Sequence, residues 1–228
     1  MAKSKGERKQ PKQARSINIV NAIVAAARKI LEEEGREALN TNYIAEVAGV
    51  NIASLYRWFS GKEEIIESSF EALVAEEIDV LVDLLQQDFE HDITVVEALS
   101  YVIDTIVQRQ LRFLRLDQDF FRKNLPSFDV GSRCVLDTDL TWVVAASEWL
   151  ADVIAKYHPE FSAAQCKFKA FLATRSIQGC CLSASTDNPE YLEHQSFKPS
   201  LYDLALHCIY SEAAGTPDAT ATFAESRE

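Results

Sequence analysis

The sequence predicts an all-α protein of about nine helices, with a small basic N-terminal domain and a larger helical C-terminal domain. Its 228 residues include only 7 glycines and 6 prolines, too few turn signals for a sheet of many short strands. Apolar residues recur at intervals of three and four along most of the chain, as amphipathic helices require. With 47% apolar residues, the chain can bury a sizeable core.

Charge is distributed unevenly between the two predicted domains. Residues 1–62 contain 11 Lys/Arg and 6 Asp/Glu, whereas residues 63–228 contain 12 and 29. The overall net charge of -12 argues by itself against nucleic-acid binding. A basic end on an acidic body is, however, the asymmetry expected where one end of a protein meets phosphates.

The N-terminal domain begins with a polar basic segment and one long helix. Residues 1–15 have no apolar period and are predicted to be disordered. This basic arm can either lie on DNA or simply aid solubility, and the sequence leaves both open. A helix is predicted from about Ser16 to Glu34, with Gly35 as its C-terminal stop.

Two short helices joined by a tight turn follow within residues 16–62. Asn40 is a suitable N-cap for the first, which ends at Gly49. Asn51 then caps a helix over Ile52–Trp58, and two short helices with a glycine turn between them form a helix-turn-helix. A further helix is predicted from a capping box made by Ser60 and Glu63.

The remaining chain is predicted to form one helical domain over residues 63–213, followed by a disordered tail over 214–228. The helix that opens this domain runs to about residue 87 and is long enough to link the two domains. Further helices are predicted at 94–116, 117–124, 137–157, 162–185 and 199–213, with a loop over 126–131.

The stretch from Ile23 to Ile66 resembles the TetR (tetracycline repressor) family of transcriptional regulators. The resemblance covers about a fifth of the chain and rests on many matches at fixed spacing. Asn51 replaces the serine cap usual in that family, and Trp58 replaces a usual tyrosine. The matching residues are Gly35, Leu39-Asn40-Thr41, Ile44-Ala45, Ala48-Gly49-Val50-Asn51, Leu55-Tyr56, Trp58-Phe59 and Lys62-Glu63.

This resemblance implies DNA contacts for the helix-turn-helix. Its third helix is expected in the major groove of double-stranded operator DNA. Thr41, Tyr56 and Lys62 are expected on phosphates, and Arg57 is suited to a bidentate contact with guanine. A rim aromatic at Tyr56 and a solvated side chain at Arg57 remain the alternatives. The full set of expected DNA-binding residues is Thr41, Asn51, Ile52, Ala53, Ser54, Tyr56, Arg57 and Lys62.

The resemblance also implies a homodimer and an unknown small-molecule inducer. The dimer is expected to form through the helices at about 162–185 and 199–213, so that two N-terminal domains reach a palindromic operator. Internal packing is the alternative for any one side chain of these helices. The candidates for the dimer interface are Phe168, Phe171, Thr174, Ile177, Cys181, Leu201, Leu204 and Cys208.

A ligand pocket is expected among the middle helices. Any single aromatic there is more often part of the ordinary core than of a pocket wall. Gln110, Arg175 and Gln178 are sharper candidates, because burying them without a partner is costly. The partner is either a ligand or an internal carboxylate such as Asp104 or Asp139. The acidic body mildly favours a neutral or cationic ligand. The candidate pocket residues are Tyr101, Gln110, Phe113, Phe121, Trp142, Trp149, Phe171, Arg175 and Gln178.

The function expected from these features is a ligand-responsive repressor. The sequence contains no motif typical of hydrolases, nucleotide-binding enzymes or zinc proteases, so we expect no catalysis, cofactor or metal. Five cysteines in no disulfide spacing favour reduced thiols in the cytoplasm, and no apolar run is long enough to span a membrane. A thiol- or metal-responsive sensor using Cys180, Cys181, His207 and Cys208 with the same DNA-binding head remains the alternative.

Overall fold

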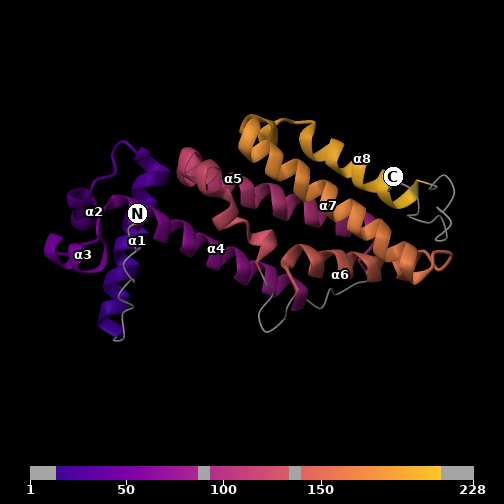
Figure 1. The fold of residues 1–228 in the computed structure, drawn as a ribbon, viewed down its shortest axis with the longest axis horizontal. Helices are drawn as coiled ribbons and strands as arrows, with labels where there is room; N and C mark the ends of the chain where they lie inside the picture. Colours follow the sequence, from indigo (N-terminus) through magenta and orange to yellow (C-terminus); the bar gives the residue numbers. More distant parts are fainter. Residues whose placement is uncertain (1–13, 87–92, 134–139, 212–228) are drawn as a thin grey trace, which may run out of the picture.

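A computed structural model describes residues 14–86, 93–133 and 140–211 of the chain. The segments expected to be disordered, residues 1–15 and 214–228, lie outside the described ranges except for Ala14 and Arg15. The prediction is wrong for these two residues, because they form the start of the first helix. Asp139 also lies outside the described ranges. Within those ranges the chain forms eight α-helices and two short 3-10 helices (Figure 1). The α-helices are α1 (Ala14–Glu34), α2 (Thr41–Val47), α3 (Ile52–Trp58), α4 (Lys62–Gln86), α5 (Val95–Phe128), α6 (Trp142–Tyr157), α7 (Ala163–Asp187) and α8 (Phe197–Tyr210).

The small domain of α1 to α3 is built from local signals that the sequence displays openly. Gly35 ends α1 at a φ of 79°, and Gly49 lies in the turn before α3 at 64°, both in the left-handed region that favours glycine. The side chain of Asn40 accepts a bond from the Tyr43 backbone N–H at 3.0 Å, and that of Asn51 accepts from Ala53 at 2.8 Å. Both predicted caps are therefore confirmed.

Helix α4 starts one residue later than predicted. The helix begins at Lys62, so Glu64 rather than Glu63 occupies its third position. The Glu64 carboxylate accepts bonds from the Ser60 backbone N–H at 2.7 Å and from the Ser60 hydroxyl at 2.8 Å. Glu63 instead faces Arg36. The predicted box paired the wrong glutamate because it placed the start of the helix one residue too early.

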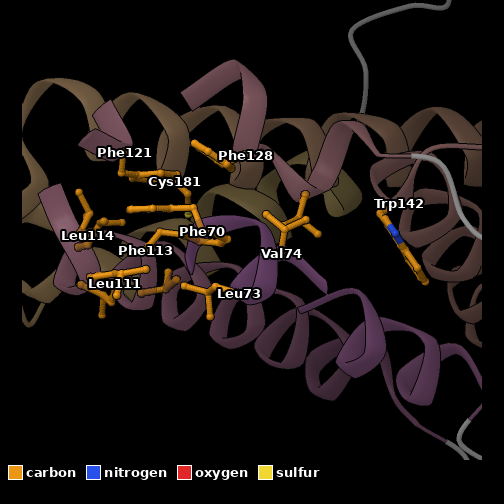
Figure 2. Packing of buried hydrophobic residues seen from close by; sticks show 14 of the residues in the cluster. Phe70, Leu73, Val74, Leu111, Phe113, Leu114, Phe121, Phe128, Trp142 and Cys181 are labelled. Atoms are coloured by element: carbon orange, nitrogen blue, oxygen red, sulfur yellow. The ribbon is translucent and has the colours of Figure 1, made fainter. Parts of the chain in front are cut away.

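Helix α4 runs out of the small domain and into the larger one, packing against α1 at one end and α5 along its course (Figure 1). Its Phe70 is completely buried in the body, where its ring lies 6.0 Å from that of Phe113 and 6.1 Å from that of Phe121. Figure 2 shows Phe70 in the midst of these side chains, with Leu73 and Val74 following along α4. One helix thus belongs to both domains, and its position couples them.

Helix α5 joins two segments that were predicted separately, which is why the helices number eight and not nine. Asp117, where the second segment was predicted to start, has non-helical dihedrals, φ -165° and ψ 99°. Its carboxylate accepts from the Phe120 backbone N–H at 3.0 Å and so caps the second segment. The predicted loop at Pro126 is wrong, because the helix continues to Phe128.

Three helices complete the larger domain. Helix α7 packs against α6 on one side and α8 on the other, and it begins with a capping box between Ser162 and Gln165 (Figure 1). Helix α8 starts at Phe197, two residues before its predicted start, after a 3-10 turn over Pro189–Glu193. In the described part of the chain, no helix combines the length and the apolar character needed to cross a membrane.

Candidate nucleic-acid interface and the interior of the larger domain

The helix-turn-helix is held by side chains that point into the small domain. Ile44 of α2 and Leu55 of α3 are completely buried, and Phe59 just after α3 is 3% exposed. Because these residues fix the inner face of α3, its opposite face is left outside. Of the residues predicted to face DNA, Asn51, Ala53, Tyr56 and Arg57 are exposed, and Thr41, Ile52, Ser54 and Lys62 are partly buried.

Two of the predicted phosphate contacts touch each other. The Thr41 hydroxyl, at the start of α2, lies 2.9 Å from the Tyr56 hydroxyl on α3, and either group can donate the bond. The Tyr56 side chain is nevertheless 54% exposed. A single phosphate oxygen placed beside this pair could accept a hydrogen bond from both hydroxyls, or from one hydroxyl and the first backbone N–H groups of α2.

The two predicted cations lie at the ends of neighbouring helices. Arg57 is in the last turn of α3, with its guanidinium carbon 5.5 Å from the centre of the Trp58 ring. Lys62 is the first residue of α4, where the positive end of the helix also favours an anion. Arg57 is therefore oriented by an aromatic neighbour and still accessible to solvent.

A compact three-helix head with an exposed recognition helix, carried on a helical body, defines the class of helix-turn-helix transcriptional regulators. Residues 23–68 match the family model described as "Bacterial regulatory proteins, tetR family". Over this segment, about a fifth of the chain, the sequence is similar to the TetR family of bacterial regulatory proteins.

Two further similarities agree with this match. Over 59 residues the chain is 37% identical to an HTH-type transcriptional regulator, YdeS, of Bacillus subtilis (strain 168), a match that spans 26% of this chain and 30% of that protein. The fold resembles the crystal structure of a transcriptional regulator of the TetR/AcrR family from Thermobifida fusca, with a TM-score of 0.54 at 14% identity, covering 85% of this chain and 98% of the other. The second similarity concerns the fold alone.

In the larger domain, several predicted pocket residues lie in a continuous apolar core. Phe113 and Phe121 are each 1% exposed and stack with ring centres 5.0 Å apart. Phe70 and Phe128 join the same group, with ring centres 5.1 Å apart. Figure 2 shows Trp142 set apart from this phenylalanine cluster, beyond Val74. Trp142 is 4% exposed, and its indole nitrogen has no hydrogen-bond partner within the described ranges.

The two predicted glutamines are buried and each has a partner. Gln110 of α5 accepts a bond from the Ser185 hydroxyl of α7 at 3.2 Å. Gln178 of α7 accepts from Arg175 at 3.3 Å. The backbone of Gly131 passes so close to Gln178 that an added Cβ would lie 2.5 Å from the Gln178 amide nitrogen. These contacts tie α5, α7 and the segment after α5 together.

Other predicted pocket residues lie at or near the surface. Tyr101 and Trp149 are partly buried. Phe171 is 48% exposed, and it lines with Arg175 an outer groove of about 220 Å³ between α6 and α7. Arg175 is exposed, so the argument that it needs a buried partner does not apply to it. Asp104, its predicted alternative partner, pairs with Lys198 at 2.6 Å.

The most unusual buried polar residues are two that the sequence analysis did not select. Arg109 of α5 is 5% exposed and Glu77 of α4 is 3% exposed. Burial lowers the pKa of Arg109, opposed by the nearby charges of Glu77 and Asp129. Burial also raises the pKa of Glu77, opposed by Arg112 and Arg109. Their signal was present in the sequence, because each charged residue occupies a position of three-and-four spacing that is otherwise apolar.

Ion pairs connect the head to the body at two places. Arg36, just after α1, binds Glu63 of α4 at 2.7 Å and also Asp117 at the kink of α5. Arg28 of α1 binds Glu76 of α4. We call the two ion pairs of Arg36, with Glu63 and with Asp117, the Arg36 clasp. The carboxylate of Asp117 is 3% exposed, so this part of the clasp lies in the interior. The contact between Arg36 and Asp117 links the head directly to α5, the helix that bears Arg109.

The cysteines offer little support for a thiol or metal sensor. Burial raises the pKa of Cys181 to about 12, so its thiol stays protonated near neutral pH. Cys180 is partly buried, and the Cys208 sulfur lies 4.0 Å from the Ser176 hydroxyl. Within residues 14–86, 93–133 and 140–211, no three His, Cys, Asp or Glu side chains gather as metal ligands would. The alternative sensor is therefore not favoured.

Proposed function

We propose that this protein is a homodimeric repressor that binds a palindromic DNA operator and releases it when a small molecule binds in the larger domain. The observation that carries the proposal is the hydroxyl pair of Thr41 and Tyr56 beside the exposed face of α3. It supplies hydrogen-bond donors for a phosphate next to a helix that is free to enter a major groove.

Contacts with bases come from the same exposed face. Ala53 is small enough to approach a thymine methyl, and Ile52 at the start of α3 extends that apolar contact. Arg57, at the other end of the helix, can form two parallel bonds with guanine. Lys62 holds the neighbouring phosphate as a point charge.

Dimerisation follows from the apolar residues that α7 and α8 leave outside. Phe168 is 59% exposed and Leu204 is 39% exposed, although both belong to helices packed firmly on the body. Exposed large apolar side chains are typical of protein interfaces. Four of the predicted interface residues are instead buried within one subunit: Thr174, Ile177, Cys181 and Leu201. The candidates that remain for the interface are Phe168, Phe171, Leu204 and the partly buried Cys208.

Release of DNA requires that the ligand favour one arrangement of the body over another. Helix α4 supplies the route, because Phe70 is packed between helices of the body while Lys62 begins the same helix in the head. The clasp of Arg36 on Asp117 adds a second connection from the kink of α5. A shift of either element changes the spacing of two heads and lowers operator affinity.

Selection of bound sequences from random duplex DNA by the purified full chain tests the function. We expect an enriched palindrome whose half-site centres lie about one helical turn, 10–10.5 base pairs, or a multiple of it apart. A protein that remains monomeric at working concentration and enriches no sequence at low salt contradicts the proposal. Analytical ultracentrifugation of the same sample supplies the oligomeric state.

A further inference from the structure

Arg109 is a buried cation of the body without a direct partner in the part of the chain that the structure describes. It is 5% exposed, and neither a hydrogen bond nor an ion pair joins its guanidinium to a described residue. Its nearest opposite charges, Glu77 and Asp129, act on it only through space. A buried arginine is ordinarily paired, since an isolated buried charge costs several kcal/mol.

The neighbouring carboxylates already have other direct partners. A carboxylate oxygen of Glu77 lies 3.0 Å from Arg112, and Arg28 holds Glu76. Asp129 accepts a bond from the Gly131 backbone N–H at 3.0 Å. Among the described residues, Arg109 is therefore left without a direct partner, with Glu77 and Asp129 near enough to offset part of its charge.

The side chains around Arg109 are otherwise apolar and buried. Phe113 lies one turn further along the same helix and belongs to the phenylalanine cluster. Cys181 of α7 is near enough to influence the charge of Arg109, and burial keeps its thiol protonated by raising its pKa to about 12. Arg109 thus borders an apolar region of the body. Figure 2 shows three side chains of this region, Phe70, Phe113 and Cys181.

We propose that Arg109 receives the carboxylate of an organic acid that serves as the inducer. This inference rests on the proposed function and adds the chemical class of its ligand. The planar fork of an arginine matches a carboxylate with two parallel bonds. A single negative charge is favoured over a double one, because Glu77 and Asp129 would repel the second charge. The local charge at Arg109, and not the acidic surface of the body, selects the ligand.

The first test is the stability of the ligand-free variant Arg109→Met. If the charge is unpaired in the free protein, its replacement by an apolar chain of similar length leaves the melting temperature unchanged or raises it. Arg115→Met is the matched control on the same helix, since Arg115 is exposed and bound to Glu193 at the surface. A fall of more than about 5 °C in Arg109→Met alone would show an internal partner and overturn the inference.

The second test compares acids with their uncharged counterparts. Short- to medium-chain n-alkanoates and phenylalkanoates are each paired with the corresponding primary amide, and melting temperature and operator binding are followed together. We expect acids, but not amides, to raise the melting temperature by several degrees and to weaken operator binding. Arg109→Met abolishes both effects, Arg109→Lys keeps part of them, and Arg115→Met keeps both.

The outcomes separate this inference from the proposed function. Amides as effective as acids, acid effects that persist in Arg109→Met, or no acid effect on a protein that binds its operator would overturn the inference and leave the repressor intact. Failure of the wild-type protein to bind any duplex would instead contradict the proposed function itself. Binding of DNA by Arg109→Met without added acid is the expected control result.

Discussion

The head and the body satisfy their polar groups in different ways. In the head, the capping side chains find partners close by, as Asn40 does with Tyr43 and Asn51 with Ala53. In the body, Gln110 reaches 75 residues along the chain to Ser185, and Arg109 finds no direct partner among the described residues. The difference teaches that the helix ends of the head are fixed by local polar contacts, whereas the body holds polar groups in its interior between helices distant in sequence.

The largest effect should come from breaking the one helix that the two regions share. Phe70→Ala removes a fully buried ring from α4, and we expect a loss of about 3–5 kcal/mol in the free energy of unfolding. Urea denaturation followed by circular dichroism measures it. Phe168→Ala, at a ring 59% exposed, is the control and should leave stability of one subunit nearly unchanged while weakening the dimer. Equal losses in the two variants would refute the assignment of Phe70 to the shared core.

Arg57→Ala should have the next largest effect, confined to the head. We expect operator binding to weaken by about 1–3 kcal/mol and one base position to lose its specificity. Lys62→Ala is the comparison, since a lost phosphate contact weakens all sequences alike and lowers the salt slope by about 1. Fluorescence anisotropy on the selected operator and on substituted operators distinguishes them. If Arg57→Ala leaves the sequence preference intact, Arg57 is only a solvated residue stacked on Trp58.

The hydroxyl pair of the head gives a smaller and more local effect. Tyr56→Phe keeps the ring and removes the bond to Thr41, so we expect operator affinity to fall by about 0.5–1.5 kcal/mol with little change in melting temperature. Thr41→Val tests the other member. If both hydroxyls serve one phosphate, the double variant should cost less than the two single losses added together. Strict additivity in titrations at fixed salt would show two separate phosphate contacts.

The smallest effect concerns the buried acid of the body. Burial raises the pKa of Glu77, so the folded protein binds a proton there more readily than the unfolded chain. The stability that this carboxyl group contributes is therefore greatest below its pKa of about 4.3 in the unfolded chain. It declines as the pH rises through the higher pKa of the folded protein. Glu77→Gln should therefore make the free energy of unfolding, measured by urea denaturation, less dependent on pH in this range. An unchanged profile would mean that Arg112 fully offsets the burial.

The same contrast explains which features could be predicted from the sequence. Caps and left-handed glycines act over a few residues, so the head was predicted almost residue by residue. The kink of α5 was found at Asp117, which caps its second segment. Pro126 misled the prediction because Asn124 also departs from helical dihedrals, and Pro126 falls in the first turn after it, where little bonding is lost.

The interior of the body was harder to predict because spacing identifies a buried face without naming what covers it. Phe171 and Arg175 have the spacing of an inner face, yet no described helix covers them in a single subunit. Arg109 was passed over in favour of its neighbour Gln110, although both are buried at the same turn. The roles in DNA and ligand binding stay predictions, since they depend on molecules beyond this chain.

The clasp of Arg36 has a consequence for any salt titration of operator binding. Its Glu63 side is 61% exposed, so dissolved ions weaken it even though the Asp117 side is sheltered. Raising the ionic strength therefore has two effects on operator binding. Salt ions compete with the cationic side chains of the protein for the DNA phosphates, and they also weaken the Arg36 ion pairs that fix the angle of each head. Counting phosphate contacts from the slope alone would overestimate them, and Arg36→Met would restore the slope that counterion release by itself produces.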